Sequence, residues 1–278
     1  MTTLANYPLG YSEAEAKRLI DQGAMLEDLT GDLLSRAGLA PGMRVLDVGC
    51  GVGDVSLLAA RLVAEKGSVL GVDRSASSLE IARGRAKRCA ALCGTANISF
   101  VEADLNTFEP DKTFDAIIGR LVLTYAPERA SMLRRLSQSL RPGGVVAMQE
   151  YDLSSFAQAP ESPLFAQVKQ WIVDGFKSAG AEPDMGSKLY ATFLQAGLLG
   201  PQMVSAQLVH CGPEATGYEQ ATQVLRSLLP SIERNRIATT TEIEIDTLAN
   251  RLREDAVKRH AVIFAPRLVS VWARAIQP

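Results

Sequence analysis

The feature that most constrains the fold is a glycine-rich turn between a short apolar segment and a helical pattern. Residues 45–56 read VLDVGCGVGDVS, with glycines at positions 49, 51 and 53. A strand that runs into such a turn and then into a helix brings backbone N–H groups and the helix N-terminus toward a ligand. We expect Asp54 to be the N-cap of that helix, because an aspartate side chain accepts hydrogen bonds from first-turn N–H groups.

The spacing of the glycines excludes one common ligand of strand–turn–helix units. A pyrophosphate-binding turn of the G-x-G-x-x-G type requires a third glycine at its sixth position. Counted from Gly49 that position is Asp54, and counted from Gly51 it is Ser56. An acidic residue at the helix start would also repel a pyrophosphate, so we expect the ligand to present a cation or neutral groups to this turn.

The alternation of strand and helix patterns continues to residue 153. Apolar segments predict strands at residues 43–49, 68–73, 98–104, 114–120 and 145–152. Helical patterns separate them at 54–67, 75–94 and 127–140, with Gly67 ending the first and Pro127 opening the third. Alternation with short links predicts an α/β fold, a doubly wound and mostly parallel sheet with helices on both faces.

The flanking segments are predicted to be mostly helical. Residues 10–38 carry apolar positions at helical spacing, and so do 165–180, 185–198 and much of 214–260. Two further strands are expected at 203–211 and 261–276, the second with a bulge at Pro266. We therefore divide the chain into an N-terminal helical segment (1–40) that closes over the ligand, a sheet core (41–153), and a helical cap with the last two strands (154–278).

Net charge, apolar runs and cysteine spacing limit the kinds of partner that the sequence predicts. The net charge is −2, whereas proteins that bind nucleic acid usually carry a basic excess, so no nucleic-acid partner is expected. No apolar run reaches the length of a membrane span, and residues 1–19 do not resemble a signal peptide. The four cysteines lack the paired spacing of a zinc site and are read as reduced thiols of a cytoplasmic protein.

Two further aspartates follow strands of the predicted sheet. Asp73 ends the second strand, 20 residues after Gly53, where a carboxylate can accept both hydroxyls of a ribose. Asp104 ends the third strand, where its carboxylate could accept a hydrogen bond from an adenine amino group and the Leu105 amide could donate to a ring nitrogen. An aspartate at a strand end can also form an ordinary turn, so a strand-terminating Asx turn at Asp104 remains an alternative.

An ordered series of motifs gives the chain a family resemblance. VLDVGCGVG, GVD, EADL, FDAIIGRLVL and LRPGG follow one another within residues 43–153. In combination they resemble class I S-adenosylmethionine-dependent methyltransferases, whose glycine turn has the G-x-G-x-G form. Segments such as GRLVLTYAP and VVAMQEYD are similar to small-molecule methyltransferases of ubiquinone and menaquinone biosynthesis and of natural-product pathways. The resemblance implies a Rossmann-like seven-stranded sheet and S-adenosylmethionine as the methyl donor.

The resemblance also implies roles for individual residues around that donor. Gly49 and Gly51 would allow close approach of its methionine and ribose parts, and Asp47 would orient the turn and the ammonium group. Asp73 would hold the ribose, and Arg74 would pack near the adenine. The expected donor-binding residues are Gln22, Asp47, Gly49, Gly51, Asp54, Asp73, Arg74, Asp104, Leu105 and Arg120, with Arg120 and Gln22 at the methionine end.

The acceptor side is less constrained by the sequence. A general base is needed when the acceptor has a proton to lose, and Glu150, Tyr151 and Tyr125 follow strands at the ligand-binding edge. We find no cluster that matches the metal ligands of catechol-type enzymes, so no metal is expected. Side chains that could line an apolar chamber are Phe156, Trp171, Phe176, Tyr190, Phe193 and Leu228.

These observations predict metal-independent methyl transfer to an oxygen, nitrogen or carbon atom of a hydrophobic or aromatic small molecule. Two alternatives remain open: carbon methylation of a prenyl or terpenoid chain, and a non-catalytic module that binds the donor for regulation. A homodimer is compatible with the sequence but is not indicated by any motif.

Overall fold

The chain forms two compact units in a computed structural model that describes residues 9–10, 12–93, 97–111 and 113–275. Within these ranges, unit 1 comprises residues 9–10, 151–186 and 205–268. Unit 2 comprises residues 12–150, 187–204 and 269–275. The rest of the predicted N-terminal segment, residues 1–8 and 11, lies outside the described residues. Each unit is described by itself below.

Unit 2 contains the predicted core and the helices that precede it. In chain order its elements are α1 (Glu13–Met25), α2 (Glu27–Ala37), β1 (Arg44–Val48), α3 (Asp54–Val63), β2 (Ser68–Asp73), α4 (Ala76–Cys93), β3 (Asn97–Glu102), β4 (Phe114–Arg120), a 3-10 turn (Leu123–Tyr125), α5 (Arg129–Ser137) and β5 (Leu140–Asp152). Three elements join it from later in the chain: α7 (Met185–Gln195), β7 (Gln202–Ala206) and β10 (Arg267–Arg274). The boundary between the units falls within β5, α7, β7 and β10.

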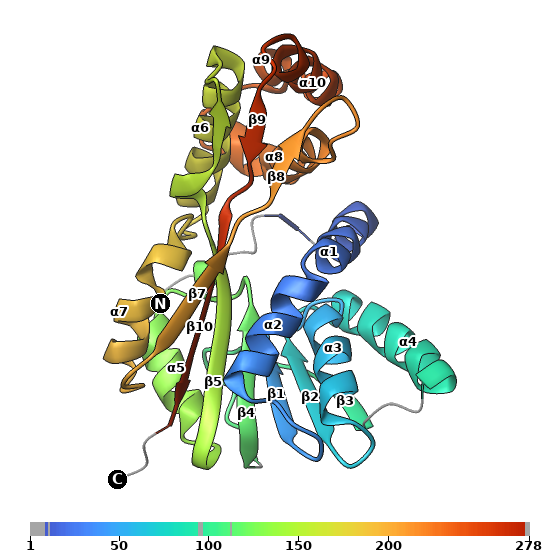
Figure 1. Cartoon of the computed structure of the whole chain (residues 1–278), viewed down its shortest axis with the longest axis vertical. Coiled ribbons are helices and arrows are strands. Elements are labelled where there is room, and N and C mark those ends of the chain that lie inside the picture. The colour runs from blue at the N-terminus through green and yellow to red at the C-terminus, as the bar shows by residue number, and fades with distance from the viewer. Residues whose placement is uncertain (1–8, 11, 94–96, 112, 276–278) are drawn as a thin grey trace. The chain divides into compact units, whose positions relative to one another are not determined.

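The seven strands of this sheet are ordered β3-β2-β1-β4-β5-β10-β7, and the first five run parallel to their neighbours. The chain adds strands in one direction up to β3 and in the opposite direction from β4, so the topological switch point lies between β1 and β4. The turns after these two strands meet at the carboxyl edge, where open α/β sheets bind ligands. Figure 1 shows α2 and α3 in front of β1 and β2, with α5 behind the strands. The predicted Rossmann-like, mostly parallel seven-stranded sheet is confirmed.

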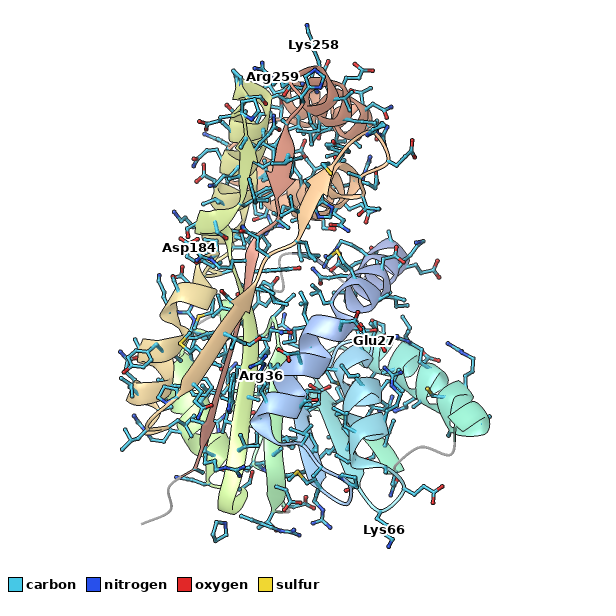
Figure 2. The ribbon with its side chains drawn as sticks, in the orientation of Figure 1. Glu27, Arg36, Lys66, Asp184, Lys258 and Arg259 are labelled. Atoms are coloured by element: carbon cyan, nitrogen blue, oxygen red, sulfur yellow. The ribbon has the colours of Figure 1, made fainter. Side chains whose placement is uncertain are left out.

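The core of unit 2 lies between the sheet and the α2–α3 layer. Leu33 and Leu34 of α2 and Ala59 of α3 pack with Val45 of β1 and Ile118 of β4, all nearly inaccessible to solvent. Helix α2 ends where Gly38 takes the left-handed conformation (φ +86°) and donates its N–H to Leu34 and Ser35. Outside the core, Glu27 of α2 pairs with Arg61 of α3; Figure 2 labels Glu27 and, farther along α2, Arg36.

Unit 1 is built from helices around a small antiparallel sheet. Its elements are a 3-10 turn (Leu153–Ser155), β6 (Ala157–Ala159), α6 (Pro163–Ser178), β8 (Val209–Cys211), α8 (Gly217–Arg234), α9 (Thr240–Ile243), α10 (Leu248–Lys258) and β9 (Val262–Phe264). The strands are ordered β6-β9-β8. Helix α6 begins at Pro163 after Ser162, whose hydroxyl accepts from the Phe165 N–H. Helices α6 and α8 approach closely, because a side chain at Gly175 would lie 3.2 Å from Leu228 and Ile232.

Several predicted boundaries in the core need correction. Helix α3 ends at Val63 rather than Gly67, because Ala64 leaves the helical conformation with φ +55°. Helix α5 begins at Arg129, with Glu128 as its N-cap, so Pro127 is not its first residue. Strand β5 begins at Leu140 rather than at residue 145 and runs through Pro142.

The two late strands are each divided. The predicted strand 203–211 forms β7 in the large sheet and β8 in the small one, and 261–276 is broken before Arg267 into β9 and β10. Pro266 stands at that break, where the lack of an N–H interrupts the ladder, so the expected bulge is a strand break. The sequence did not predict β6.

Unit 2 combines most of the predicted core with helices α1 and α2. The three-part division of the chain into 1–40, 41–153 and 154–278 therefore stays a proposal about roles and not about compact units.

Candidate active site

The glycine turn lies between β1 and α3, where the sequence predicts it. Gly49, Gly51 and Gly53 have φ values of +65°, +52° and +87°, a region that other residues adopt only with strain. A side chain at Gly49 would meet the Val122 methyl Cγ2 at 2.4 Å. A side chain at Gly51 would meet nothing within 4 Å, so Gly51 forms the open face of the turn.

Asp73, at the end of β2, fixes the open part of this turn. Its Oδ2 accepts from the Gly51 N–H at 2.9 Å, and its Oδ1 accepts from the Ser75 N–H at 2.8 Å. Each carboxylate oxygen can accept two hydrogen bonds, so both oxygens keep capacity for hydroxyl donors. Arg74 beside it is exposed.

Asp54 does not cap α3. The N-cap is Gly53, whose left-handed conformation ends the turn, and Asp54 is the first helical residue. Its carboxylate instead pairs with Arg85 of α4 at 2.7 Å and lies 3.9 Å from the Arg120 guanidinium. Because Asp54 lies inside the helix start, its side chain is directed to neighbouring cations and not to first-turn N–H groups.

Asp47 is the most buried carboxylate of this group. It lies in β1 between Gly71 of β2 and Ile118 of β4, and its Oδ2 accepts from the Ser56 hydroxyl at 2.5 Å. Burial raises the pKa of Asp47 to about 7, and nearby Asp73 and Asp54 add to the rise, while the Ser56 hydroxyl and the Arg120 charge oppose it. The turn is therefore surrounded by carboxylates whose repulsion a cationic ligand would relieve.

Helices α1 and α2 pack directly against this group. A side chain at Gly23 would lie 2.4 Å from the Asp54 carboxyl carbon, so α1 requires glycine where it crosses the start of α3. Gln22 next to it is half-buried, and its backbone carbonyl accepts from the Leu26 N–H at 3.0 Å. Sequence reasoning selected Gln22 and missed Gly23, although a glycine within a helical pattern is a signal of close packing.

Thr30 is a second residue that the sequence did not single out. Its hydroxyl accepts from Arg120 Nη1 at 3.0 Å and lies 2.9 Å from the Gln149 side-chain oxygen. Gln149 in turn donates to the Ser270 hydroxyl at 2.9 Å. Helix α2, the end of β4, β5 and β10 are thus joined by one buried chain of polar contacts.

The turn after β3 brings Leu105 toward the glycine turn. The Leu105 methyl Cδ1 would lie 3.9 Å from a side chain at Gly49, and its carbonyl accepts from Arg135 of α5. Asp104 forms an Asx turn, in which Oδ1 accepts from the Asn106 backbone and side-chain nitrogens at 2.9 and 2.8 Å. The alternative weighed for Asp104 is therefore present, and its contact with adenine stays a prediction.

Glu150 is wholly buried near the end of β5. Its Oε1 accepts from the Val122 and Leu123 N–H groups at 2.9 and 2.6 Å, and its Oε2 from the Thr124 hydroxyl at 2.9 Å and N–H at 3.4 Å. Burial raises the pKa of Glu150 to about 7 against the opposing effect of these bonds. The carboxylate is thus directed at the chain after β4, and its role as a general base stays a prediction that this geometry does not support.

The two candidate tyrosines fall in different units. Tyr125 ends the 3-10 turn of unit 2 and is half-buried, with its N–H donated to the Val122 carbonyl at 3.1 Å. Tyr151 is the first residue of the second segment of unit 1 and is also half-buried. The six side chains expected to line a chamber are also divided between the units: Tyr190, in unit 2, is 51% exposed, and Leu228, in unit 1, is core.

Comparison with known proteins now decides the family. Residues 39–196 match a family described as "Methyltransferase domain". The chain belongs to this methyltransferase family. It is 32% identical over 193 residues to a 2-phytyl-1,4-naphtoquinone methyltransferase of Synechococcus elongatus, covering 68% of this chain and 79% of that protein.

Two further comparisons agree with the family. A trans-aconitate 2-methyltransferase of Methylobacterium nodulans is 38% identical over 122 residues, covering 44% of this chain and 43% of that protein. The crystal structure of the YcgJ protein of Bacillus subtilis has the same fold, with a TM-score of 0.59 and 20% identity over 90% of this chain and 98% of that one. The protein is a class I S-adenosylmethionine-dependent methyltransferase.

The residues around the glycine turn fit this donor. S-adenosylmethionine carries a sulfonium and an ammonium cation, which suit a turn bordered by Asp47, Asp54 and Asp73. Gly51 leaves room for the ligand, and the Asp73 oxygens keep acceptor capacity for ribose hydroxyls. The assignment of each residue to a part of the donor stays a prediction.

Within the described ranges, no three His, Cys, Asp or Glu side chains are grouped so that they could hold a metal ion. None of the helices in the described part of the chain has both the length and the apolar character needed to cross a membrane.

Proposed function

We propose that this methyltransferase transfers a methyl group from S-adenosylmethionine to an oxygen, nitrogen or carbon atom of a hydrophobic small molecule, without a metal. The observation that supports this acceptor class best is the relative named for a phytyl-substituted naphthoquinone, whose match extends over 68% of this chain. The match to the trans-aconitate enzyme covers 44% and supports the shared donor-binding region more than a shared acceptor.

The proposed chemistry depends on positioning. The bound donor supplies an electrophilic methyl group on its sulfonium, so the protein has to hold an acceptor atom in line with the methyl–sulfur bond. On the donor side we assign the ribose hydroxyls to Asp73, the close approach to Gly49 and Gly51, and the methionine end to Arg120, Asp47 and Gln22. Arg120 is suited to the donor carboxylate because its guanidinium is largely buried beside Asp54.

Proton removal is assigned to a tyrosine or to no side chain at all. Glu150 has both oxygens engaged by the residues after β4, which leaves Tyr125 and Tyr151 of the three candidates. A phenol or hydroquinone acceptor with a lowered pKa needs no strong base, so the loss of either hydroxyl is expected to lower kcat only modestly.

The test is a methyl-transfer assay with labelled donor and a panel of acceptors. The panel contains a naphthoquinol, a phenolic polyketide, an alkaloid amine, a prenyl chain and trans-aconitate, and mass spectrometry identifies the methylated atom. Methylation of an aromatic or quinone acceptor is the expected result. Preferential methylation of trans-aconitate would overturn the acceptor class, and donor binding without turnover of any acceptor would favour a non-catalytic module.

The proposal places the enzyme in the cytoplasm and in natural-product metabolism. Its basis is the absence of disulfides among Cys50, Cys89 and Cys211 together with the kind of acceptor proposed. Cell fractionation tests the location, and sedimentation of the purified protein tests whether it forms a homodimer.

A further inference from the structure

The carboxylate of Glu150 is the centre of an unusual backbone arrangement. Three successive N–H groups, those of Val122, Leu123 and Thr124, point at one side chain, together with the Thr124 hydroxyl. Consecutive N–H groups that converge in this way form a concave anion site. Here the anion is supplied by the protein itself, from a strand that lies next to β4 in the sheet.

The chain before this anion site is strained. Leu121 has φ +57°, a left-handed conformation that a residue with a Cβ adopts only with strain. Such a conformation persists only where its surroundings impose it. The Leu121 N–H is held by the Gln149 carbonyl at 2.8 Å, and the next three residues are held by Glu150. Neighbouring residues of β5 thus fix the whole change of direction after β4.

The same segment contacts the glycine turn. Val122 fills the space that a side chain at Gly49 would need, 2.4 Å from its Cγ2, and its Cγ1 lies 3.2 Å from a side chain built at Gly119. On the far side, Arg129 of α5 donates to the Leu123 carbonyl at 2.9 Å. A shift of residues 121–124 would therefore move Val122 away from Gly49 and alter the turn.

The lone pairs of Glu150 are directed into this segment. Each oxygen accepts two of the four hydrogen bonds, and none of these donors belongs to an acceptor molecule. A general base must instead offer a lone pair to the proton that it removes. The geometry therefore separates Glu150 from the proton-transfer role that its position in the sequence suggests.

We propose that Glu150 is a positioning residue of the methyltransferase: it holds residues 121–124 against the glycine turn and so fixes the methionine end of the donor site. The proposal rests on the donor-dependent activity of the family and is independent of the acceptor class proposed above. Residues 121–124 line the donor site beside the glycine turn, and Glu150 holds them in this position before the donor binds.

The first test compares Glu150→Gln with the wild type. Glutamine keeps the shape, but its amide nitrogen faces N–H donors, so part of the anion site is lost. We expect the amides of 122–124 to exchange with solvent at least 10-fold faster, and the Kd of S-adenosylhomocysteine to rise about 10- to 100-fold. The donor KM should rise in parallel, while kcat at saturating donor should fall less than 10-fold.

The opposite pattern would overturn the proposal. A general base removed from the site lowers kcat by roughly 10²- to 10⁴-fold and leaves donor affinity unchanged. Unchanged exchange at 122–124 in Glu150→Gln would contradict it equally. If wild-type protein fails to bind S-adenosylhomocysteine, the donor site itself is wrong, and this result is distinct from a Glu150→Gln variant that binds normally.

Two further variants control for stability. Thr124→Val removes only the hydroxyl bond to Oε2 and should produce a smaller change of the same kind, so it carries the test if Glu150→Gln does not fold. Val63→Ala changes a core residue at the end of α3, remote from the glycine turn. This variant should lower the melting temperature and leave the Kd of S-adenosylhomocysteine within 2-fold of the wild type. If Glu150 had a purely structural role, Glu150→Gln would show the same pattern.

Discussion

The glycine-turn region of unit 2 and the helical region of unit 1 are stabilised in different ways. Around the turn, each group constrains another: Asp73 accepts from Gly51, Val122 fills the space at Gly49, and Glu150 holds the segment that carries Val122. Unit 1 contains apolar contacts such as the edge-to-face pair of Phe156 and Phe165, with ring centroids 4.7 Å apart. Polar groups with fixed partners shape the first region, whereas apolar packing of this kind tolerates substitution at similar volume.

This difference explains why the donor could be identified and the acceptor could not. The motifs that resemble class I methyltransferases place a glycine turn and carboxylates at successive strand ends, and these leave a recognisable spacing. Recognition of the hydrophobic acceptor proposed above would depend on packing, where many apolar residues are interchangeable.

The largest effect is expected for Asp73→Ala. It removes two charge-assisted hydrogen bonds to backbone N–H groups, each worth about 1.5–3 kcal/mol, together with the proposed ribose contact. We expect the Kd of S-adenosylhomocysteine, measured by calorimetry, to rise at least about 100-fold, since each 1.4 kcal/mol is tenfold. Asp115→Ala, at the start of β4, removes bonds to Arg44 and Arg141 and should leave this Kd unchanged.

The next largest effect is expected for Gly49→Ala, compared with Gly51→Ala in the same turn. Gly49→Ala places a methyl group 2.4 Å from Val122, and overpacking of this kind costs about 1–3 kcal/mol in addition to left-handed strain. Gly51→Ala meets no atom within 4 Å and should destabilise the fold only by left-handed strain, about 1–2 kcal/mol. Urea unfolding of the ligand-free protein measures both, and equal losses would contradict the close contact between Val122 and the turn.

The pH dependence of stability should reflect the buried carboxylates. The native pKa of Asp47 is about 7, above its unfolded value, so the folded state binds more protons between these two values. Stability therefore falls as pH rises from about 4 to 7, by an amount on the order of 2–4 kcal/mol for such a group. Asp47→Asn should remove this part of the slope.

Unfolding midpoints between pH 5 and 8.5 compare Asp47→Asn with the wild type. The pKa of His210 in unit 1 is lowered by burial and contributes a slope of the opposite sign, so the difference between the two proteins is the quantity of interest. Parallel curves for the two proteins would show that Asp47 does not bind the extra proton.

The smallest effect is expected in unit 1. The Gln158 side-chain oxygen is buried without a hydrogen-bond partner in the described residues, and its nitrogen makes only long contacts of 3.3 and 3.4 Å to Pro160 and Asp255. Gln158→Leu should change the free energy of unfolding by less than about 1 kcal/mol, because an unsatisfied group is replaced by an apolar one. The Kd of S-adenosylhomocysteine should stay within 2-fold, and a larger change would break the contrast between the units.

Prediction from sequence succeeded where structure is determined locally. The bounds expected for β2 and β4 are those observed, because continuous apolar runs bounded by turn residues define a buried parallel strand. The glycine turn was expected between a strand and a helix, and it lies between β1 and α3.

Prediction failed where a residue's role depends on a distant partner. Thr30 is joined to Arg120 and Gln149 across 90 and 119 residues of chain, and no local pattern marks such a contact. The orientation of Glu150 toward residues 122–124 likewise depends on the pairing of β4 with β5, so the sequence indicated an acidic residue at a strand end and not its partner.

Hydrogen exchange with and without S-adenosylhomocysteine tests the central claim most directly. If the donor is held by the glycine turn and its supports, binding should slow exchange of the amides in residues 47–56, 73–75 and 120–125. Helices α6 and α8 of unit 1 should then exchange at the same rate in both states. Slower exchange confined to α6 and α8, with the glycine turn unchanged, would contradict the assignment of the donor site to unit 2.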